Sequence, residues 1–185
     1  KNVFITGVAG FVGSNLAKNL TLCGANVFGL TLNKKVKSLL YFENIDKKIN
    51  LIFGDITNKK LLKNIFLKHN IHVCFHLAAQ VEVGSALKYP YLTWETNIRG
   101  TYTLLEVIRE NKKKIRSIII ASSDKAYGDY PLNSLPYKEN YQLKPNFPYD
   151  TSKACADMIA KSYSSKLFKL PLIITRFANI YGPGQ

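Results

Sequence analysis

Short apolar runs alternate along the whole chain with longer amphipathic stretches. The apolar runs have the length of β-strands and lie at 3–6, 26–30, 50–53, 73–77, 117–122 and 172–176, and the helical stretches lie at 11–23, 58–69, 91–111 and 149–166. Parallel strands need long crossover connections, so this alternation is typical of a parallel sheet with helices on its faces. We therefore expect an α/β fold with a doubly wound parallel sheet in the strand order 3-2-1-4-5-6, which binds its ligand at the carboxyl ends of the strands.

The turn that follows the first strand is rich in glycine, with Gly7, Gly10 and Gly13 directly after the run 3–6. Here the first glycine allows a tight turn, the second lets the backbone approach a pyrophosphate, and the third lets the helix pack closely on the strand. The helix directs free amides at the phosphates. The turn predicts a Rossmann-type dinucleotide site, which also includes Phe11 and Val12. A nucleoside-triphosphate loop is not supported, because no Gly-Lys-Ser/Thr sequence occurs.

The residues after the second strand bear on which dinucleotide is bound. An acidic residue usually binds the adenosine ribose at this point, but here the sequence is Thr31-Leu32-Asn33-Lys34-Lys35. Thr31 or Asn33 can hydrogen-bond the ribose hydroxyls, whereas Lys34 or Lys35 can accept a 2′-phosphate. We expect NAD over NADP, with Thr31 at the cofactor.

The ends of the third and fourth strands supply the rest of the predicted cofactor site. Asp55 can accept a hydrogen bond from the adenine amino group, or it can cap the helix that begins near Asn58, and both alternatives stay open. The small side chains of Ala78 and Ala79 leave room for the nicotinamide and its ribose. The residues assigned to this part of the site are Asp55, Ile56, Leu77, Ala78 and Ala79.

Tyr149 and Lys153 are four residues apart in a predicted helix. This spacing places a phenol and an ammonium group on one helix face. A neighbouring cation stabilises the phenolate and lowers the pKa of the tyrosine, which can then act as a base. The pair, together with the glycine turn, predicts nicotinamide-dependent chemistry.

The chain has 185 residues and a formal net charge of +14, which invites a nucleic-acid interpretation. The lysines, however, are spread over most of the predicted surface helices and form no single stripe. Three of them, at 112–114, end a helix, where cations are favoured by the helix dipole. We therefore expect no nucleic-acid partner, although some attraction for an anionic ligand remains.

Other ligand and compartment classes are not indicated by the sequence. No apolar run reaches membrane-spanning length, and the chain starts with a strand in place of a signal peptide, so we expect a cytoplasmic protein without a membrane partner. Cys23, Cys74 and Cys155 are odd in number and far apart, which favours reduced, buried thiols. We expect no metal site, because His76 is interpreted as the end of a strand.

Seven motifs in order carry a resemblance that spans the whole chain. They are Thr6-Gly-x-x-Gly-Phe11-x-Gly13, Gly54-Asp55-Ile56, His76-Leu77-Ala78-Ala79-Gln80, Thr96-Asn97-x-x-Gly100-Thr101, Ser122-Ser123-Asp124, Tyr149-x-x-x-Lys153 and Arg176-x-x-Asn179-x-Tyr181-Gly182-Pro183-Gly184. Together they resemble the NAD-dependent epimerase/dehydratase family, the extended short-chain dehydrogenases. The resemblance implies a nucleotide-diphosphate hexose as substrate.

The resemblance also implies catalytic roles. Tyr149 takes a proton from a sugar hydroxyl while hydride leaves the same carbon for NAD, and Lys153 lowers the pKa of Tyr149 and holds the nicotinamide ribose. Ser123 hydrogen-bonds the reacting oxygen. In the family's 4,6-dehydratases, the residue at Asp124 protonates the departing 6-hydroxyl and the residue at Lys125 takes the proton from C5. As a base, Lys125 needs a lowered pKa, which burial beside Lys153 would give; otherwise Lys125 pairs with Asp124 and places the substrate.

Other positions have supporting roles by resemblance. Asn97 is expected to support the site through backbone or water contacts, Arg176 to be a structural cation, and Asn179 to bind substrate phosphates. Tyr127 either stacks on the substrate or packs in the protein. Family members commonly form homodimers through two helices each, and the helix side with Tyr102, Leu105, Ile108 and Arg109 is a candidate for that contact.

Three functions remain open. The Asp-Lys pair at 124–125 and the sequence Phe28-Gly29-Leu30-Thr31-Leu32-Asn33 resemble CDP-glucose 4,6-dehydratase, which we prefer; the run Ile180-Tyr181-Gly182-Pro183-Gly184 is closer to the 4-epimerases. A non-catalytic dinucleotide sensor is the third alternative, against which the Tyr149–Lys153 pair argues. Family members run well past Gln185, so we expect residues 1–185 to be one NAD-binding domain, cut before the substrate-binding lobe.

Overall fold

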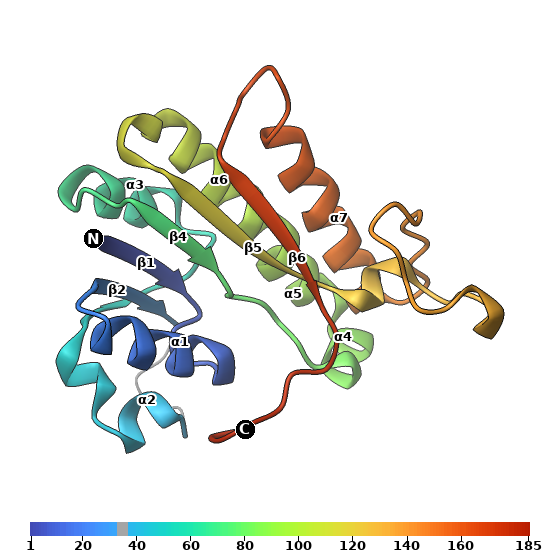
Figure 1. Cartoon of the computed structure of the whole chain (residues 1–185), viewed down its shortest axis with the longest axis horizontal. Helices are drawn as coiled ribbons and strands as arrows, with labels where there is room; N and C mark the ends of the chain where they lie inside the picture. The colour runs from blue at the N-terminus through green and yellow to red at the C-terminus, as the bar shows by residue number, and fades with distance from the viewer. Residues whose placement is uncertain (33–36) are drawn as a thin grey trace.

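One parallel sheet organises the chain, of which the computed structural model describes residues 1–32 and 37–185. The strands are β1 (Asn2–Thr6), β2 (Asn26–Thr31), β3 (Asn50–Phe53), β4 (Val73–His76), β5 (Ser117–Ser123) and β6 (Leu172–Phe177). Their order is β3-β2-β1-β4-β5-β6, with every neighbouring pair parallel (Figure 1). The predicted fold and strand order are confirmed. Asn33, Lys34 and Lys35, on which the choice between NAD and NADP partly rests, lie outside the described residues.

Helices connect the strands and cover the sheet. The α-helices are α1 (Phe11–Leu22), α2 (Leu39–Phe42), α3 (Lys59–Lys68), α4 (Val83–Lys88), α5 (Pro90–Trp94), α6 (Gly100–Glu110) and α7 (Pro148–Tyr163). The 3₁₀ turns are η1 (Ile45–Lys48), η3 (Lys112–Lys114), η4 (Asp124–Tyr127) and η5 (Leu132–Ser134). The stop predicted for α1 at Gly24 is confirmed by its left-handed φ of 75°. The short helices α2 and α4 were not expected.

The helix predicted for 91–111 is interrupted. A π-helical turn, η2 (Glu95–Arg99), separates α5 from α6, and within it the amide of Gly100 donates to the carbonyl of Glu95. One extra residue is thereby inserted into the helix. The insertion changes the directions in which the side chains of this turn point. Hydrophobic periodicity does not reveal such an insertion, and π turns are frequent at functional sites.

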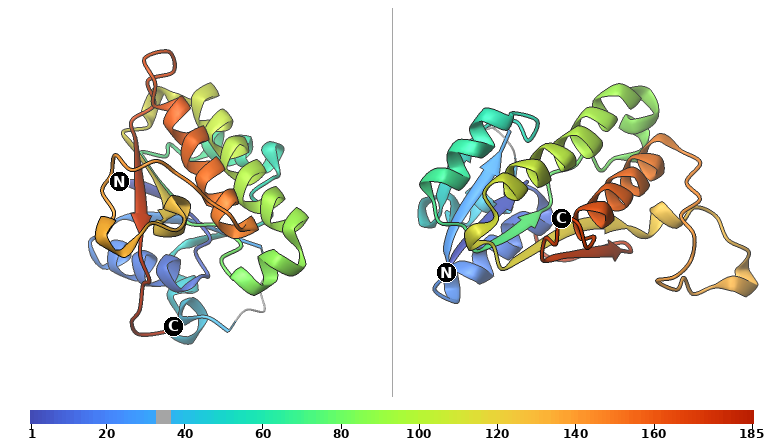
Figure 2. Two further views of the ribbon diagram at one scale, coloured as in Figure 1. Left: turned by 90° about the vertical axis from the view of Figure 1, so that its right-hand side faces the viewer. Right: turned by 90° about the horizontal axis from the view of Figure 1, so that it is seen from above.

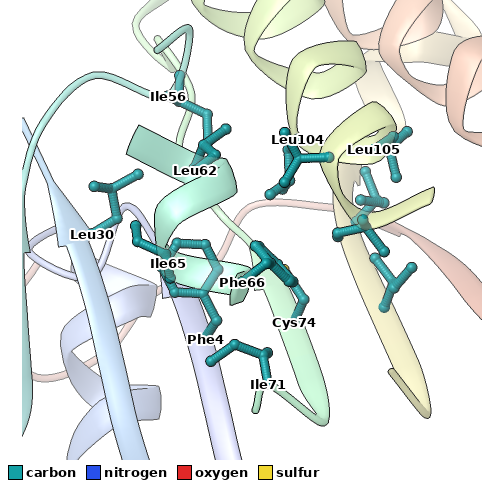
Figure 3. Packing of buried hydrophobic residues seen from close by; sticks show 14 of the residues in the cluster. Phe4, Leu30, Ile56, Leu62, Ile65, Phe66, Ile71, Cys74, Leu104 and Leu105 are labelled. Carbon is teal, nitrogen blue, oxygen red and sulfur yellow. The ribbon is translucent and has the colours of Figure 1, made fainter. Parts of the chain in front are cut away.

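Two hydrophobic clusters hold the layers together, one on each face of the sheet. The larger joins α3, α6 and α7 to the sheet and contains Phe4, Phe66, Leu104 and Leu105 (Figure 3). Phe4 and Phe66 meet edge to face, with ring centroids 5.6 Å apart. The smaller cluster lies under α1 and α2 on the opposite face. The strands are therefore buried between two helical layers where β1 and β2 pass.

Among residues 1–32 and 37–185, helices cover only one face of the β5–β6 side of the sheet. Helix α7 packs on that face, whereas Ile173 on the edge strand β6 is 55 % exposed and Phe177 is 38 % exposed. Figure 2 shows β6 with no helix on its other side. Beyond β6 the chain crosses back to α1, where the side chain of Asn15 donates to the carbonyl of Pro183 at 3.1 Å.

Residues 128–147 project from the sheet edge beyond β5 (Figures 1 and 2). Stacked tyrosines order this segment: the rings of Tyr127 and Tyr137 lie 4.9 Å apart, and those of Tyr130 and Tyr141 lie 5.0 Å apart. The segment 128–148 is rich in proline, tyrosine and asparagine, which predicts a loop over the site. It is a loop with one short 3₁₀ turn, but none of residues 129–147 lines either pocket described below, so its place over the site is not confirmed.

The three free cysteines lie in different environments, and no membrane-spanning helix is found among the described residues. Cys74 is buried, Cys155 is partly buried and Cys23 is exposed, so the expectation of buried thiols fails at Cys23. Burial raises the pKa of Cys74 well above its usual value. Among the described residues, no helix has the length and apolar character needed to cross a membrane.

Candidate active site

A groove of about 440 Å³ lies at the carboxyl ends of β1 to β4. Gly7 has a φ of 71°, and a Cβ added to it would lie 2.8 Å from the backbone of Ala78. A Cβ on Gly13 would lie 2.3 Å from the carbonyl oxygen of Gly7. Both positions therefore exclude a side chain, and the turn can keep this shape only with glycine.

The start of α1 faces this groove. Gly10 is the N-cap residue and has no side chain to occupy the first amides of the helix. These amides and the positive end of the helix dipole are suited to a phosphate group. The predicted residues that line the groove are Gly7, Gly10, Phe11, Val12, Gly13, Thr31, Asp55, Ile56, Leu77, Ala78 and Ala79. The structure thus brings the whole predicted cofactor set together, apart from the Tyr149–Lys153 pair.

Asp55 is exposed at the adenine end expected for this groove. Its Oδ1 accepts from the backbone amide and the hydroxyl of Thr57, both at 2.7 Å. The cap of α3 is Asn58, whose Oδ1 accepts from the amide of Leu61 at 3.0 Å. The alternative in which Asp55 caps this helix was therefore wrong, and its carboxylate remains on the groove wall.

A second cavity of about 300 Å³ adjoins the groove. Val12, Leu77, Ala79 and Val81 line both cavities, so the two form one continuous cleft. The second cavity is lined by the predicted catalytic and substrate residues Ser123, Asp124, Lys125, Tyr149, Lys153 and Asn179. We call the first cavity the dinucleotide groove and the second the reaction cleft.

Tyr149 and Lys153 lie on the first two turns of α7 and are both buried. Burial lowers the pKa of Lys153 to about 8, and its Nζ donates to the carbonyl of Ala121 at 3.0 Å. The pKa of Tyr149 is raised by burial, whereas a hydrogen bond with Ser123 lowers it and Asp150 and Asp124 raise it. The expected net lowering of the Tyr149 pKa by Lys153 is therefore wrong for this structure, because desolvation of the phenolate dominates.

Ser123, Asp124 and Lys125 pass from β5 into the turn η4. The hydroxyl of Ser123 donates to Asp124 Oδ1 at 3.1 Å and accepts from the amide of Lys125 at 3.2 Å. Lys125 is exposed, so the burial beside Lys153 that would lower its pKa for a role as a base is not present. Among the described residues, no ion pair joins Lys125 to Asp124. Its charge acts instead on Asp150, whose pKa is raised by burial and lowered by Lys125.

Arg176 and Tyr127 are parts of the protein scaffold behind the cleft. Arg176 donates from Nε and Nη2 to the two carboxylate oxygens of buried Asp157, at 2.8 and 3.1 Å. It also donates from Nη1 to the hydroxyl of Tyr127 at 2.8 Å. The structural role expected for Arg176 is confirmed, and Tyr127 takes the packing alternative.

Burial contradicts the dimer face that was predicted on the helix side with Tyr102, Leu105, Ile108 and Arg109. Leu105 and Ile108 are fully buried in the core, so the helix side named for a dimer contact cannot face a second subunit as predicted. Tyr102 remains exposed, and Arg109 pairs with Glu106 at 2.6 Å. In the part of the chain that the structure describes, no three side chains are arranged to hold a metal ion.

Comparison with known proteins assigns the chain to a family. The sequence model of the GDP-mannose 4,6 dehydratase family matches residues 4–185. The chain is 40 % identical to a dTDP-D-glucose 4,6-dehydratase of Dictyostelium discoideum, and 32 % identical to a CDP-glucose 4,6-dehydratase of Salmonella typhimurium. Each alignment covers 100 % of this chain, with 45 % of the first relative and 54 % of the second.

Solved structures agree with that assignment. A UDP-glucose 4-epimerase of Thermotoga maritima superposes with a TM-score of 0.89 at 28 % identity, over 100 % of this chain and 58 % of that one. A dTDP-glucose 4,6-dehydratase of Bacillus anthracis, solved in complex with NAD, superposes with a TM-score of 0.85 at 31 % identity, over 100 % of this chain and 56 % of that one. The chain thus spans about half the length of the relatives it matches. It belongs to the GDP-mannose 4,6 dehydratase family and, as the motifs predicted, to the NAD-dependent epimerase/dehydratases.

Proposed function

We propose that the chain is the NAD-binding domain of a nucleotide-sugar 4,6-dehydratase whose substrate lobe lies beyond residue 185. The observation that carries this proposal is the continuous cleft that joins the glycine-rich groove to Ser123, Asp124, Tyr149 and Lys153. A groove alone fits a binding module. A groove that opens onto a tyrosine, a lysine and an acidic residue fits an enzyme that oxidises and dehydrates its substrate.

The dinucleotide groove fits NAD in shape and chemistry. Side chains at Gly7 and Gly13 would fill the turn that a pyrophosphate approaches, and both positions are bare. Thr31 and Asp55 present polar groups at the opposite end from the reaction cleft. Bound in this groove, NAD would supply a reversible hydride acceptor for oxidation at the sugar C4 and later reduction at C6.

Tyr149 is proposed to take the proton from the sugar 4-hydroxyl as hydride leaves C4. A hydrogen bond donated by Ser123, whose single hydroxyl hydrogen is directed at Asp124 in this structure, would lower the phenol pKa and so oppose the effect of burial. Lys153 lies one helical turn away, directed at the carbonyl of Ala121 at the floor of the cleft. We propose that this ammonium group orients the nicotinamide ribose and supports the phenolate.

Water loss across C5 and C6 is assigned to Asp124 and Lys125. For this step Lys125 would have to lose its own proton once bound substrate covers it; it would then take the C5 proton, Asp124 would give a proton to the departing 6-hydroxyl, and a C5–C6 double bond would form as water leaves. With the hydride returned to C6, the proton held by Lys125 would go back to C5 and complete the 4-keto-6-deoxy sugar, with no net redox change. The Asp-Lys pair favours CDP-glucose as substrate through the resemblance stated above.

A 4-epimerase is the second candidate. Lys125 is exposed and lies near Asp150, and this position does not favour a C5 base. An epimerase needs Tyr149, Lys153 and Ser123 but neither Asp124 nor Lys125. The likeness to the Thermotoga maritima epimerase is consistent with this reaction.

The full-length protein is incubated with CDP-glucose, dTDP-glucose, UDP-glucose and GDP-mannose, each deuterated at C4. A dehydratase yields a 4-keto-6-deoxy product with deuterium at C6. An epimerase yields the C4 epimer with deuterium still at C4. NAD binding without turnover of any of the four would support the sensor and overturn the proposal.

Two variants identify the groups involved. Asp124→Asn is expected to retain oxidation at C4, seen as reduced cofactor in a single turnover, while water loss stops. Tyr149→Phe is expected to lose both steps. If Asp124→Asn still forms the deoxy product at the wild-type rate, the assignment of Asp124 is wrong.

A further inference from the structure

Five buried polar side chains form a connected line beneath the groove and the cleft. They are Thr6 on β1, His76 on β4, Thr101 on α6, Asn97 in the π turn and Ser152 on α7, each no more than 4 % exposed. None of them lines either cavity. The line joins the strand that starts the dinucleotide groove to the helix that carries Tyr149.

Its first half begins at the floor of the groove. Thr6 Oγ1 accepts from the amides of Leu77 and Ala78, both at 3.1 Å, so its hydrogen is free to bond His76 Nδ1 at 2.8 Å. The hydroxyl of Thr101 donates to the carbonyl of Asn97 at 2.6 Å. Thr101 must therefore accept from His76 Nε2, at 2.9 Å, which fixes one neutral tautomer.

The environment of His76 agrees with that tautomer. Burial, and secondarily the charge of Lys153, lower its pKa to about 3. The imidazole is therefore neutral across the physiological range, with one donor and one acceptor. Each is used by one threonine, and a charged ring would break the bond from Thr6.

The second half runs through the side chain of Asn97. Its Oδ1 accepts from the amide of Gln80 at 2.8 Å, and its Nδ2 donates to the carbonyl of Gln80 at 3.0 Å and to Ser152 Oγ at 2.8 Å. Ser152 then donates to the carbonyl of Tyr149 at 2.7 Å. Asn97 thus binds both the chain next to Ala79, on the wall shared by the two cavities, and the first turn of α7.

These bonds bear on the position of Tyr149. Buried hydrogen bonds in series polarise one another and hold a defined geometry, because a missing partner leaves a costly unpaired group. Asn97 stands in a π turn, a rare element that occurs mostly as single turns and frequently at functional sites. The bond from Thr101 to the Asn97 carbonyl is the contact that ties this turn to His76.

We propose that Thr101 and His76 are positioning residues, which hold the Asn97 turn and, through Ser152, keep Tyr149 in line with the dinucleotide groove. This inference rests on the proposed function for its kinetic effect. It goes beyond the proposed function because it assigns a role to two residues that line neither cavity.

The kinetic test uses three variants of the full-length protein. Thr101→Val keeps the shape and removes the hydroxyl, Thr101→Ser restores it, and Thr103→Val alters a buried threonine on the same helix outside the network. Misplacing a catalytic group by about 1 Å costs roughly 100-fold, so we expect kcat to fall about 10- to 100-fold in Thr101→Val. KM and NAD affinity should stay within about twofold, and Thr101→Ser and Thr103→Val should resemble the wild type.

A second readout does not depend on turnover. Nitrogen NMR of the full-length protein should show His76 neutral, with its proton on Nε2. In Thr101→Val, the amide signals of Ser152 and Tyr149 should shift, whereas in Thr103→Val they should not. Shifts confined to Thr101 and His76, or equal loss of kcat in both valine variants, would overturn the inference. Absence of turnover in the wild type would refute the proposed function alone, because the NMR result still decides this one.

Discussion

The dinucleotide groove and the reaction cleft share a wall but are constructed in different ways. The groove is formed where β1 to β4 end, by glycines, small apolar residues and backbone. The cleft depends on polar side chains from β5, η4 and α7, whose positions rely on buried hydrogen bonds from distant strands. The groove is therefore sensitive to added volume, and the cleft is sensitive to the loss of single polar atoms.

The largest expected effect follows from removing one oxygen atom from the reaction cleft, which should change turnover but not NAD binding. Tyr149→Phe should lower kcat roughly 10²- to 10⁴-fold, because a positioned general base contributes about that much. NAD affinity should change by no more than about twofold, since the groove is untouched. Steady-state kinetics and NAD titration of the full-length protein measure both.

Tyr163→Phe is the matched control for this change. Tyr163 lies on the same helix, and its hydroxyl donates to Glu106 at 3.1 Å, away from the cleft. Its turnover should equal that of the wild type. If Tyr149→Phe turned over substrate at the wild-type rate, the reaction cleft would not be the catalytic site proposed here.

The next effect adds one carbon to the groove. In Gly13→Ala the new Cβ would lie 2.3 Å from the carbonyl oxygen of Gly7 and 2.8 Å from Val8 Cα, both backbone atoms, so the turn must move. NAD affinity should fall at least about tenfold, and the free energy of unfolding should fall by about 1–3 kcal/mol. Calorimetric titration and denaturant unfolding test these values.

Gly84→Ala is the control for an added methyl group. A Cβ at Gly84 meets nothing within 4 Å, and the residue lies in α4. This variant should bind NAD normally and be as stable as the wild type or slightly more stable. If Gly13→Ala behaves in the same way, the groove does not hold the pyrophosphate.

A pH effect of intermediate size is expected from Lys153. Its pKa is about 8 in the folded protein against 10.5 for the unfolded reference, so between these values the unfolded state holds more protons. The free energy of unfolding of the wild type should therefore rise, relative to Lys153→Met, as the pH increases from 8 to 10.5. The gain is up to about 3 kcal/mol, at 1.36 kcal/mol per pKa unit.

Comparing the two proteins cancels the titration of other groups. Below pH 8 Lys153 is protonated in both states, and the difference between the proteins should level off. A difference that is flat from pH 8 to 10.5 would show that Lys153 is hydrated, contrary to its burial in the cleft.

The smallest expected effect is at the adenine end of the groove. Asp55→Asn keeps the shape but weakens an acceptor, and NAD affinity should fall about two- to tenfold, in line with about 1 kcal/mol for one hydrogen bond. Turnover at saturating NAD should be unchanged. A fall in kcat without a change in NAD affinity would move Asp55 out of the cofactor site.

The sheet and the groove could be predicted from sequence because their signals are local. Strand length, hydrophobic alternation and the glycine turn at 7–13 act over a few residues, and the carboxyl ends of parallel strands meet at one edge. The helix break at Glu95–Arg99 could not be predicted from sequence, because a π turn leaves the hydrophobic pattern almost unchanged.

The cleft was predictable only as a set of residues. The partners of His76 and Asn97 are 70 and 55 positions away, and threonine, histidine and serine carry no pattern that reveals such bonds. The predictions about the surroundings of Lys125 and the pKa of Tyr149 were wrong for a related reason. Whether Lys125 is buried and whether Tyr149 loses solvent depend on how η4 and α7 pack, which spacing along the chain does not determine.

A structure of full-length Tyr149→Phe with NAD and a nucleotide hexose tests the central claim most directly. The account predicts the pyrophosphate at Gly10, the adenine beside Asp55, and the nicotinamide between Ala79 and Lys153, with the sugar C4 facing the ring at position 149. A dinucleotide bound outside the groove, or a nicotinamide directed away from the cleft, would contradict it.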